Sequence, residues 1–163
     1  MPHANAERVQ AALAAQGIST QVVELADSTR TAAEAAAAIG TTVAQIAKSL
    51  VFLAGDDAIL VIASGVNRVD TAKLAAQLGV ARSAIKRPDA DTVKRLTGFP
   101  IGGVAPIAHA TPLRTLLDRD LMQYDDIWAA AGTPHAVFRT TPQELERITG
   151  AETSDLREEP AQS

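Results

Sequence analysis

The stretch "SLVFLAGDDAILVIAS", residues 49–64, decides the fold. Two almost continuously apolar runs, 49–54 and 58–64, flank the polar turn residues at 55–57. Two apolar runs around a short turn are typical of a β-hairpin, and strands that are apolar at nearly every position lie in the middle of a sheet. We therefore expect this hairpin to form the centre of a β-sheet.

Helix signals surround the hairpin. Thr31 and Thr141 each begin a capping-box pattern, and Gly40 and Gly150 follow as helix stops. The predicted helices cover residues 4–16, 31–40, 70–78, 91–96 and 141–150, and further strands are predicted at 20–25, 113–118, 126–132 and 136–141. Because helices and strands alternate irregularly and hairpins are present, the pattern favours an α+β fold over a parallel doubly wound one.

The length of 163 residues fits a single domain with a buried core. From Glu152 onward the chain is polar and acidic, so we predict a domain over 1–156 and a flexible acidic tail over 157–163. The absence of cysteine favours a reducing compartment. The sequence shows no signal peptide and no apolar run of about 20 residues, and we therefore expect a cytoplasmic protein that does not enter a membrane.

The net charge of −4 argues against a basic nucleic-acid-binding domain, and no DNA partner is expected. Any contact with nucleic acid would need a local basic patch, although solvated helix faces explain single basic residues equally well. The candidate basic residues are Arg68, Lys73, Lys86, Arg87, Lys94 and Arg95.

Several familiar catalytic motifs are missing from the sequence. It contains no phosphate-binding Walker loop, no dinucleotide-binding glycine motif, no nucleophile elbow and no zinc-protease motif. The three histidines, His3, His109 and His135, lie far apart, so neither a metal site nor a cofactor is expected. Ser64 comes at a strand end before a glycine, where serine more often forms a turn than acts as a nucleophile.

Lys48 follows a short capped turn and precedes the apolar run of the hairpin. At a helix end, a lysine complements the helix dipole and points to water. At the rim of a sheet, the same cation could face a phosphate or a developing oxyanion. Local sequence leaves both interpretations open.

The segment "GFPIGGVAPIAHATPL", residues 98–113, contains the pair Gly102 and Gly103 between Pro100 and Pro106. Adjacent glycines leave their amide groups unshielded and allow positive φ, so both N–H groups could point at a ligand. The alternative is a tight turn that packs closely against the sheet.

Taken together, four segments resemble the YbaK/ProX family, the free-standing relatives of the editing domain inserted in bacterial prolyl-tRNA synthetases. The resemblance runs from about residue 8 to 156, and "STRTAAEAA" at 28–36 is closest to the ProX-like branch. The segments are "IAKSLVF" at 46–52, "SGVNRVDTAKLAAQLG" at 64–79, residues 98–113 quoted above, and "IWAAAGTPHAVFRTTPQELERITGAETSDL" at 127–156. The resemblance implies an α+β fold with a mixed sheet flanked by helices. It also implies hydrolysis of a wrong amino acid from the 3′ end of a tRNA, without a metal ion or a covalent intermediate.

The resemblance assigns roles residue by residue. Lys48 would lie near the terminal adenosine and its phosphate, and the backbone of Gly102 and Gly103 would face the aminoacyl ester. The residues implied to bind substrate are Ser64, Val104, Pro106, His109, Ala130 and His135. Ala130 and Val137 stand where the cysteinyl branch of the family tends to carry Ser and Asp, which argues against a cysteine substrate.

The expected function is therefore a deacylase that edits in trans, acting at the acceptor end of a tRNA-Pro that carries a small amino acid. Prolyl-tRNA synthetase is the candidate protein partner. Two alternatives stay open at this point: a module that binds a tRNA acceptor end or a nucleotide without hydrolysis, and a regulatory protein associated with a synthetase.

Overall fold

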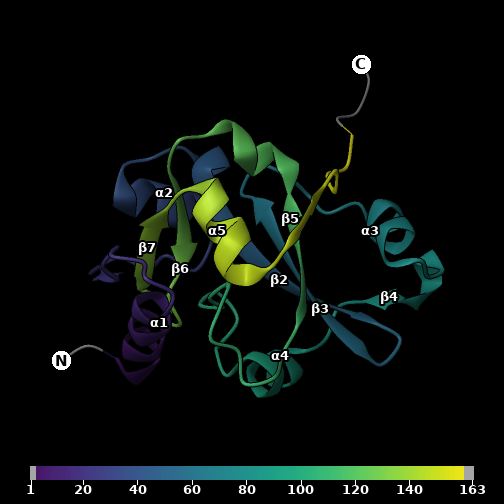
Figure 1. Cartoon of the computed structure of the whole chain (residues 1–163), viewed down its shortest axis with the longest axis horizontal. Helices are drawn as coiled ribbons and strands as arrows, with labels where there is room; N and C mark the ends of the chain where they lie inside the picture. The colour runs from purple at the N-terminus through teal and green to yellow at the C-terminus, as the bar shows by residue number, and fades with distance from the viewer. Residues whose placement is uncertain (1–2, 160–163) are drawn as a thin grey trace.

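The computed structural model describes residues 3–159 of the chain. Over this range, five helices surround one mixed eight-stranded sheet (Figure 1), which confirms the predicted single-domain α+β fold. The helices are α1 (Ala4–Ala15), α2 (Ala32–Ile39), α3 (Thr71–Leu78), α4 (Ala90–Thr97) and α5 (Pro142–Thr149). The strands are β1 (Val23–Glu24), β2 (Ile46–Ala54), β3 (Asp57–Ser64), β4 (Ile85–Lys86), β5 (Arg114–Asp118), β6 (Ile127–Ala130), β7 (Ala136–Thr140) and β8 (Glu152–Ser154).

The predicted hairpin is the pair β2 and β3, and it occupies the middle of the sheet. The strand order is β1-β7-β6-β2-β3-β5-β8, with the short β4 also paired to β2. Ala54 pairs with Asp57, so the turn consists of Gly55 and Asp56 and is one residue shorter than predicted. Gly55 has a φ of +62°, a conformation that two-residue hairpin turns require and that glycine adopts without strain.

The edge of β2 that faces away from β3 pairs with different strands along its length. Ile46 and Ala47 pair in parallel with β6, whereas Leu53 and Ala54 pair in antiparallel fashion with β4. Between these pairings, residues 48–52 have no strand partner on that edge within the described chain. We call this interruption of the sheet the β2 gap.

Helices cover both faces of the sheet. On one face, α1, α4, α5 and the loop 98–113 bury the main core, in which Phe99 and Phe138 are the largest buried side chains. On the other face, α2 packs on Ile46, and α3 packs through Leu74 on the β2–β3 hairpin. Because side chains alternate along β2, successive residues of this strand face these two different layers.

The predicted caps and late elements are confirmed in place. Thr31 and Thr141 accept hydrogen bonds from the amides at the third positions of their helices, and Gly40 and Gly150 end those helices with left-handed backbone. The predicted pair of strands at 126–132 and 136–141 is the antiparallel pair β6 and β7.

Other predictions need correction. The strand expected at 20–25 shortens to Val23–Glu24 at the edge of the sheet. Lys48 lies inside β2, not at a helix end, because the 3-10 turn before it ends at Gln45. The acidic segment from Glu152 forms the strand β8, which pairs with β5.

The expected flexible tail, 157–163, begins with residues that contact the domain. Arg157 bridges to Val69, and the Glu158 N–H donates to the Arg68 carbonyl at 2.8 Å. Residues 160–163 of that tail lie outside the described residues. Within residues 3–159, no helix combines the length and hydropathy needed to cross a membrane.

Leu156 anchors this last segment, since its side chain is only 1% exposed and packs in the cluster that contains Leu74. Leu156→Ala should lower the free energy of unfolding by about 2–5 kcal/mol, because it opens a cavity beneath α3. Urea unfolding checks this. The control is Val66→Ala, at a side chain 61% exposed, which should change stability little. Equal losses in the two variants would show that the segment does not belong to the core.

Candidate functional site

A cavity of about 230 Å³ opens at the β2 gap. Its wall comes from β2, from β6 and β7, from α2 with the loop before it, and from the loop 98–113. The lining residues are Thr29–Ala32, Ala35, Ile46–Val51, Arg87, Val93, Ile101, Gly102, Val104, Trp128–Ala130 and Val137. The gap thus gives a ligand access to a strand in the middle of the sheet.

The side chains on the two faces of the sheet give this cavity two chemically different sides. On the layer of the main core, Val51, Val93 and Val104 form an apolar wall. On the opposite layer, Lys48 projects from β2 beside the apolar Leu50, and Arg87 follows β4. One side therefore suits a small apolar group, and the other suits an anion.

Lys48 is half-buried in this cavity. Burial lowers the pKa of Lys48 below its ordinary value of 10.5, Asp118 opposes this shift, and the positive charges of Arg68 and Arg87 reinforce it. Among residues 3–159, no ion pair includes Lys48 or Arg87. Two cations without a carboxylate partner thus line one side of the cavity.

Arg87 is held by an aromatic ring. Its guanidinium lies 4.9 Å from the centre of the Phe52 ring, and burial lowers its pKa. A guanidinium stays charged under all ordinary conditions. The cation–π contact therefore leaves its hydrogen-bond donors free for a ligand.

The two glycines of the loop 98–113 have different roles. Gly102 lines the cavity with a φ of +87°, and the Gly103 N–H donates to the Pro100 carbonyl at 3.0 Å, as in a type II turn. A Cβ on Gly103 would lie 2.7–2.9 Å from main-chain atoms of Thr133. The expectation that both amides point at a ligand is therefore wrong for Gly103, whose N–H closes the turn and whose missing side chain permits close packing.

Of the residues proposed from the sequence, Lys48, Gly102, Val104 and Ala130 meet at this cavity. Gly103 lies next to it in the chain without lining it.

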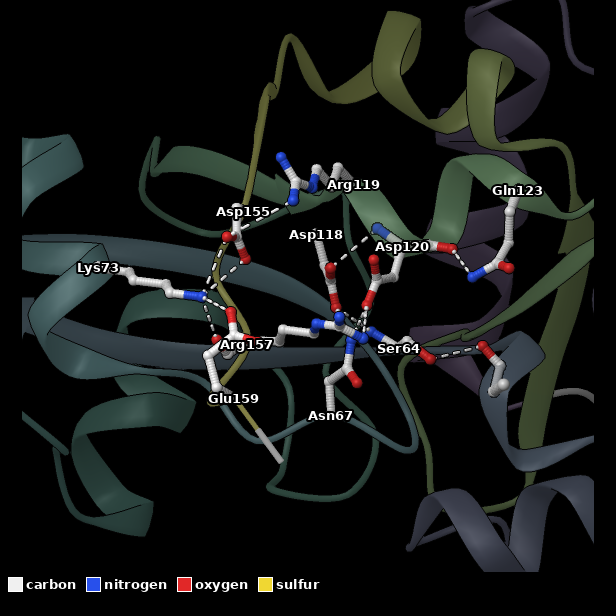
Figure 2. Close-up of polar contacts among 11 residues, drawn as sticks. Ser64, Asn67, Lys73, Asp118, Arg119, Asp120, Gln123, Asp155, Arg157 and Glu159 are labelled. Atoms are coloured by element: carbon white, nitrogen blue, oxygen red, sulfur yellow. Dashed lines mark hydrogen bonds and ion pairs between the residues drawn. The ribbon is translucent and has the colours of Figure 1, made fainter. Parts of the chain in front are cut away.

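Ser64 lies elsewhere, fully buried. Its N–H donates to Asp118 Oδ2 at 3.0 Å, and its hydroxyl donates to the Ala44 carbonyl at 2.7 Å. Figure 2 shows that the Asp118 carboxylate also accepts from the Asn67 side-chain amide and from the Asp120 N–H. The assignment of Ser64 to substrate binding is therefore corrected, because it ties the end of β3 to β5 and to the turn before β2.

His109 and Pro106 line a second cavity, between α1, α5 and the loop. His109 Nε2 lies 2.7 Å from the Ala105 carbonyl, and its ring meets Phe99 edge-on. Burial lowers the pKa of His109, the Ala105 carbonyl opposes this shift, and Arg8 reinforces it. The two residues brace the loop and do not reach the first cavity.

His135 is also outside the first cavity. Its N–H donates to Thr133 Oγ1 at 3.2 Å, and its Nδ1 lies 3.2 Å from the Asp27 carbonyl. In addition, the Thr29 N–H donates to the Pro134 carbonyl at 2.6 Å. These bonds fasten the loop before α2 to the β6–β7 turn, so the placement of His135 against substrate is corrected.

Several cavity residues were not proposed from the sequence, among them Arg30, Thr31, Ser49, Leu50, Arg87 and Trp128. Alternation along the strand around Lys48 could have identified Leu50. Arg87 was noted only as one of six candidate basic residues, and the two-residue strand before it is too short to recognise, so its place at the cavity could not be predicted. Within the described residues, no cluster of three or more His, Asp or Glu side chains could hold a metal ion.

Comparisons with known proteins identify the family of this chain. The model of the aminoacyl-tRNA editing domain matches residues 26–148. The uncharacterised protein YwhH of Bacillus subtilis (strain 168) is 33% identical over 129 residues, 78% of this chain and 80% of YwhH. Among solved structures, a candidate trans-editing enzyme for prolyl-tRNA synthetase is 48% identical with a TM-score of 0.91, over 98% of this chain and all of that one. The hypothetical protein APE2540 is 29% identical with a TM-score of 0.85, over 93% of this chain and 99% of that one.

Gly103→Ala should destabilise the protein by about 1–3 kcal/mol, because the added Cβ forces the loop away from the Thr133 main chain. Urea unfolding measures the loss. Ala108→Gly is the matched control in the same loop: Ala108 has a φ of +64°, so glycine relieves strain there and should be close to neutral. If Gly103→Ala left the free energy of unfolding unchanged, the proposed close packing of Gly103 against Thr133 would be contradicted.

His109 should make the fold sensitive to acid. Because its folded-state pKa is lowered, the unfolded chain binds a proton more readily as the pH falls below 6.5, and the free energy of unfolding falls with it. Urea unfolding at a series of pH values from 7 to 5 should show a smaller slope in His109→Gln than in the unaltered protein. Identical slopes would mean that His109 is not held neutral.

Proposed function

Because the chain belongs to the aminoacyl-tRNA editing domain family, we propose that it hydrolyses the ester of a mischarged tRNA in trans. The proposed substrate is tRNA-Pro that carries a small amino acid, and prolyl-tRNA synthetase is the proposed partner. The 48% identity to a candidate trans-editing enzyme for that synthetase supports this choice. The reaction would take place in the cytoplasm, where aminoacyl-tRNA is used.

One observation carries the proposal: the cavity joins an apolar wall to cations, Lys48 and Arg87 among them, that form no ion pair within residues 3–159. An aminoacylated tRNA end has the same two parts, an anionic phosphodiester and a small organic group on the terminal ribose. Lys48 and Arg87 would hold the phosphate, and the valine side chains would surround the amino acid. Local cations also explain how a protein of net charge −4 binds a polyanion.

The apolar wall would select the amino acid by size. Val51, Val93 and Val104 lie within the core cluster, so they cannot move aside without disturbing it. A larger side chain would meet this wall, whereas one extra methylene in a roomy apolar pocket changes binding by only about 1–3 kcal/mol. Steric exclusion of larger side chains by the valine wall therefore discriminates between amino acids better than favourable apolar contacts do in such a site.

In the proposed reaction, a water adds to the ester carbonyl carbon and the bond to the ribose 3′ oxygen breaks. The water supplies one proton to the departing oxygen, and the products are the free amino acid and the tRNA hydroxyl. Negative charge develops on the carbonyl oxygen, where oriented N–H donors stabilise it. Gly102 offers one such donor, since its N–H has no acceptor within the described residues. The ester is already activated, so positioning supplies much of the remaining rate.

Lys48→Ala should lower deacylation of the cognate mischarged tRNA by about 100-fold or more, because the phosphate loses its nearest cation. The measurement is release of labelled amino acid from a panel of mischarged tRNAs, including alanyl- and seryl-tRNA-Pro. Lys94→Ala, at an exposed lysine on α4, is the control and should keep full activity. Tight binding of the acceptor end without lysine-dependent release of any amino acid would favour the binding-module alternative.

Val104→Ala should widen the accepted set of amino acids, because it removes part of the apolar wall. Release from tRNA carrying valine should rise relative to release from tRNA carrying alanine, by about tenfold or more. The ratio of kcat/KM for the two substrates is the measurement. An unchanged ratio with a folded variant would place the amino acid away from this wall.

A further inference from the structure

The main chain of β2 offers unused hydrogen-bonding groups inside the cavity. In an antiparallel pair, alternate residues direct both their N–H and C=O groups toward the partner strand, and the others direct them away. The Gly65 N–H donates to the Ile46 carbonyl at 2.8 Å, so the even-numbered residues of β2 face β3. The Gly55 N–H donates to the Ala84 carbonyl at 3.1 Å on the other edge. Odd-numbered residues therefore face β6, the β2 gap and β4.

Two odd-numbered residues, Ser49 and Val51, lie within the β2 gap. No hydrogen bond among residues 3–159 engages the N–H or the C=O of either one on that side. Unpaired main-chain groups inside a protein are costly and rare, so a pair of them in a cavity wall indicates a ligand position.

Ser49 is the residue that a ligand can reach. Val51 is 2% exposed, whereas Ser49 is partly exposed and lines the cavity. The Ser49 hydroxyl is buried and has no hydrogen-bond partner, so the exposed part of this residue consists of its other atoms. With the hydroxyl buried, the main-chain N–H and C=O are the polar groups of Ser49 that remain for a ligand.

Resting on the proposed function, we propose that the Ser49 main chain binds the aminoacyl group of the tRNA. Its N–H donates to the ester carbonyl oxygen, and its C=O accepts from the α-ammonium group. An amino acid ester presents this acceptor and this donor as a residue in a neighbouring antiparallel strand does, and strand edges capture peptides in this way. The aminoacyl group would thus complete the sheet where β6 and β4 leave it open.

This arrangement divides recognition between backbone and side chains. The main-chain pair recognises what all L-amino acid esters share, while Val51, Val93 and Val104 face what differs between them. The Ser49 N–H would also be a donor to the carbonyl oxygen as it gains negative charge, a role that the Gly103 N–H cannot take while it closes its turn.

The first test is amide NMR with 3′-deoxy-3′-(L-alanylamino)adenosine 5′-monophosphate, an amide analogue that cannot be deacylated as an ester. The Ser49 amide should show the largest shift change in β2 and become protected from hydrogen exchange, while the Leu50 amide, already bonded to β3, should change little. Adenosine 5′-monophosphate, which lacks the aminoacyl group, should perturb Arg87 and leave the Ser49 amide unchanged. The proposal would be overturned if the aminoacyl analogue did not shift the Ser49 amide signal, or if adenosine 5′-monophosphate shifted it by the same amount.

The second test replaces the Ser49 N–H with an ester oxygen by incorporating the α-hydroxy analogue of alanine at position 49. Ser49→Ala is its matched control, because it lacks the hydroxyl but keeps the N–H. The ester variant should bind the aminoacyl analogue at least about tenfold more weakly than Ser49→Ala binds it. Equal binding by the two variants would refute the role of the N–H. Binding of the analogue without release from any mischarged tRNA would instead refute the proposed function and leave this contact standing.

Discussion

The hydrogen bonding between β2 and β3 determines where every group of the candidate site faces. Eight residue pairs join the two strands without interruption, from Ala47 with Ser64 to Ala54 with Asp57. This long register fixes one edge of β2 and so allows the opposite edge to change partner and stay open in the middle. If β2 were paired along its whole length on both edges, no cavity would open beside it. If it were paired on neither edge, the Lys48 side chain would have no fixed orientation.

The electrostatics of the site depend on that same placement. Lys48 is half-buried and Arg87 is exposed at the rim of the cavity, and among residues 3–159 neither has a carboxylate within ion-pairing distance. Partial loss of contact with water lowers the pKa of each side chain. The buried Asp118 carboxylate, which accepts from several N–H donors, opposes the lowering of the Lys48 pKa. Six other cations form ion pairs: Lys73, for instance, contacts Asp155, Glu159 and the Arg157 carbonyl (Figure 2). Lys48 and Arg87 differ from these paired cations and leave positive charge available to a ligand at the cavity.

The sequence predicted those features that local patterns encode. The hairpin follows from its apolar runs, and the helix ends at Thr31, Gly40, Thr141 and Gly150 follow from capping chemistry. The family resemblance added Lys48, Gly102, Val104 and Ala130 as members of one site, and the cavity contains all four.

Features that depend on partners far away in the chain could not be predicted. A two-residue strand such as β4 has no periodicity to detect, so the β2 gap could not be predicted. For the same reason, the candidate basic residue Arg87 could not be placed at the rim of that gap. The polar run of β8 is a strand only because β5 pairs with it. The burial of Ser64 could not be predicted, because no nearby residue indicates its hydrogen bond to Asp118, more than fifty residues later. The family resemblance placed His109 and His135 at the substrate, whereas in the structure a ring nitrogen of each lies close to a main-chain carbonyl of the protein, outside the cavity.

The position of β8 has a consequence for synthesis of the chain on the ribosome. The residues that line the cavity all lie between Thr29 and Val137, whereas β8 begins at Glu152. The nascent chain therefore releases the complete set of cavity residues before the strand that ends the sheet. Until β8 emerges, the edge of β5 stays bare and can pair with another chain. The last segment, with Leu156 and the contacts of Lys73, thus protects the newly made protein from edge-to-edge association as well as stabilising the finished fold.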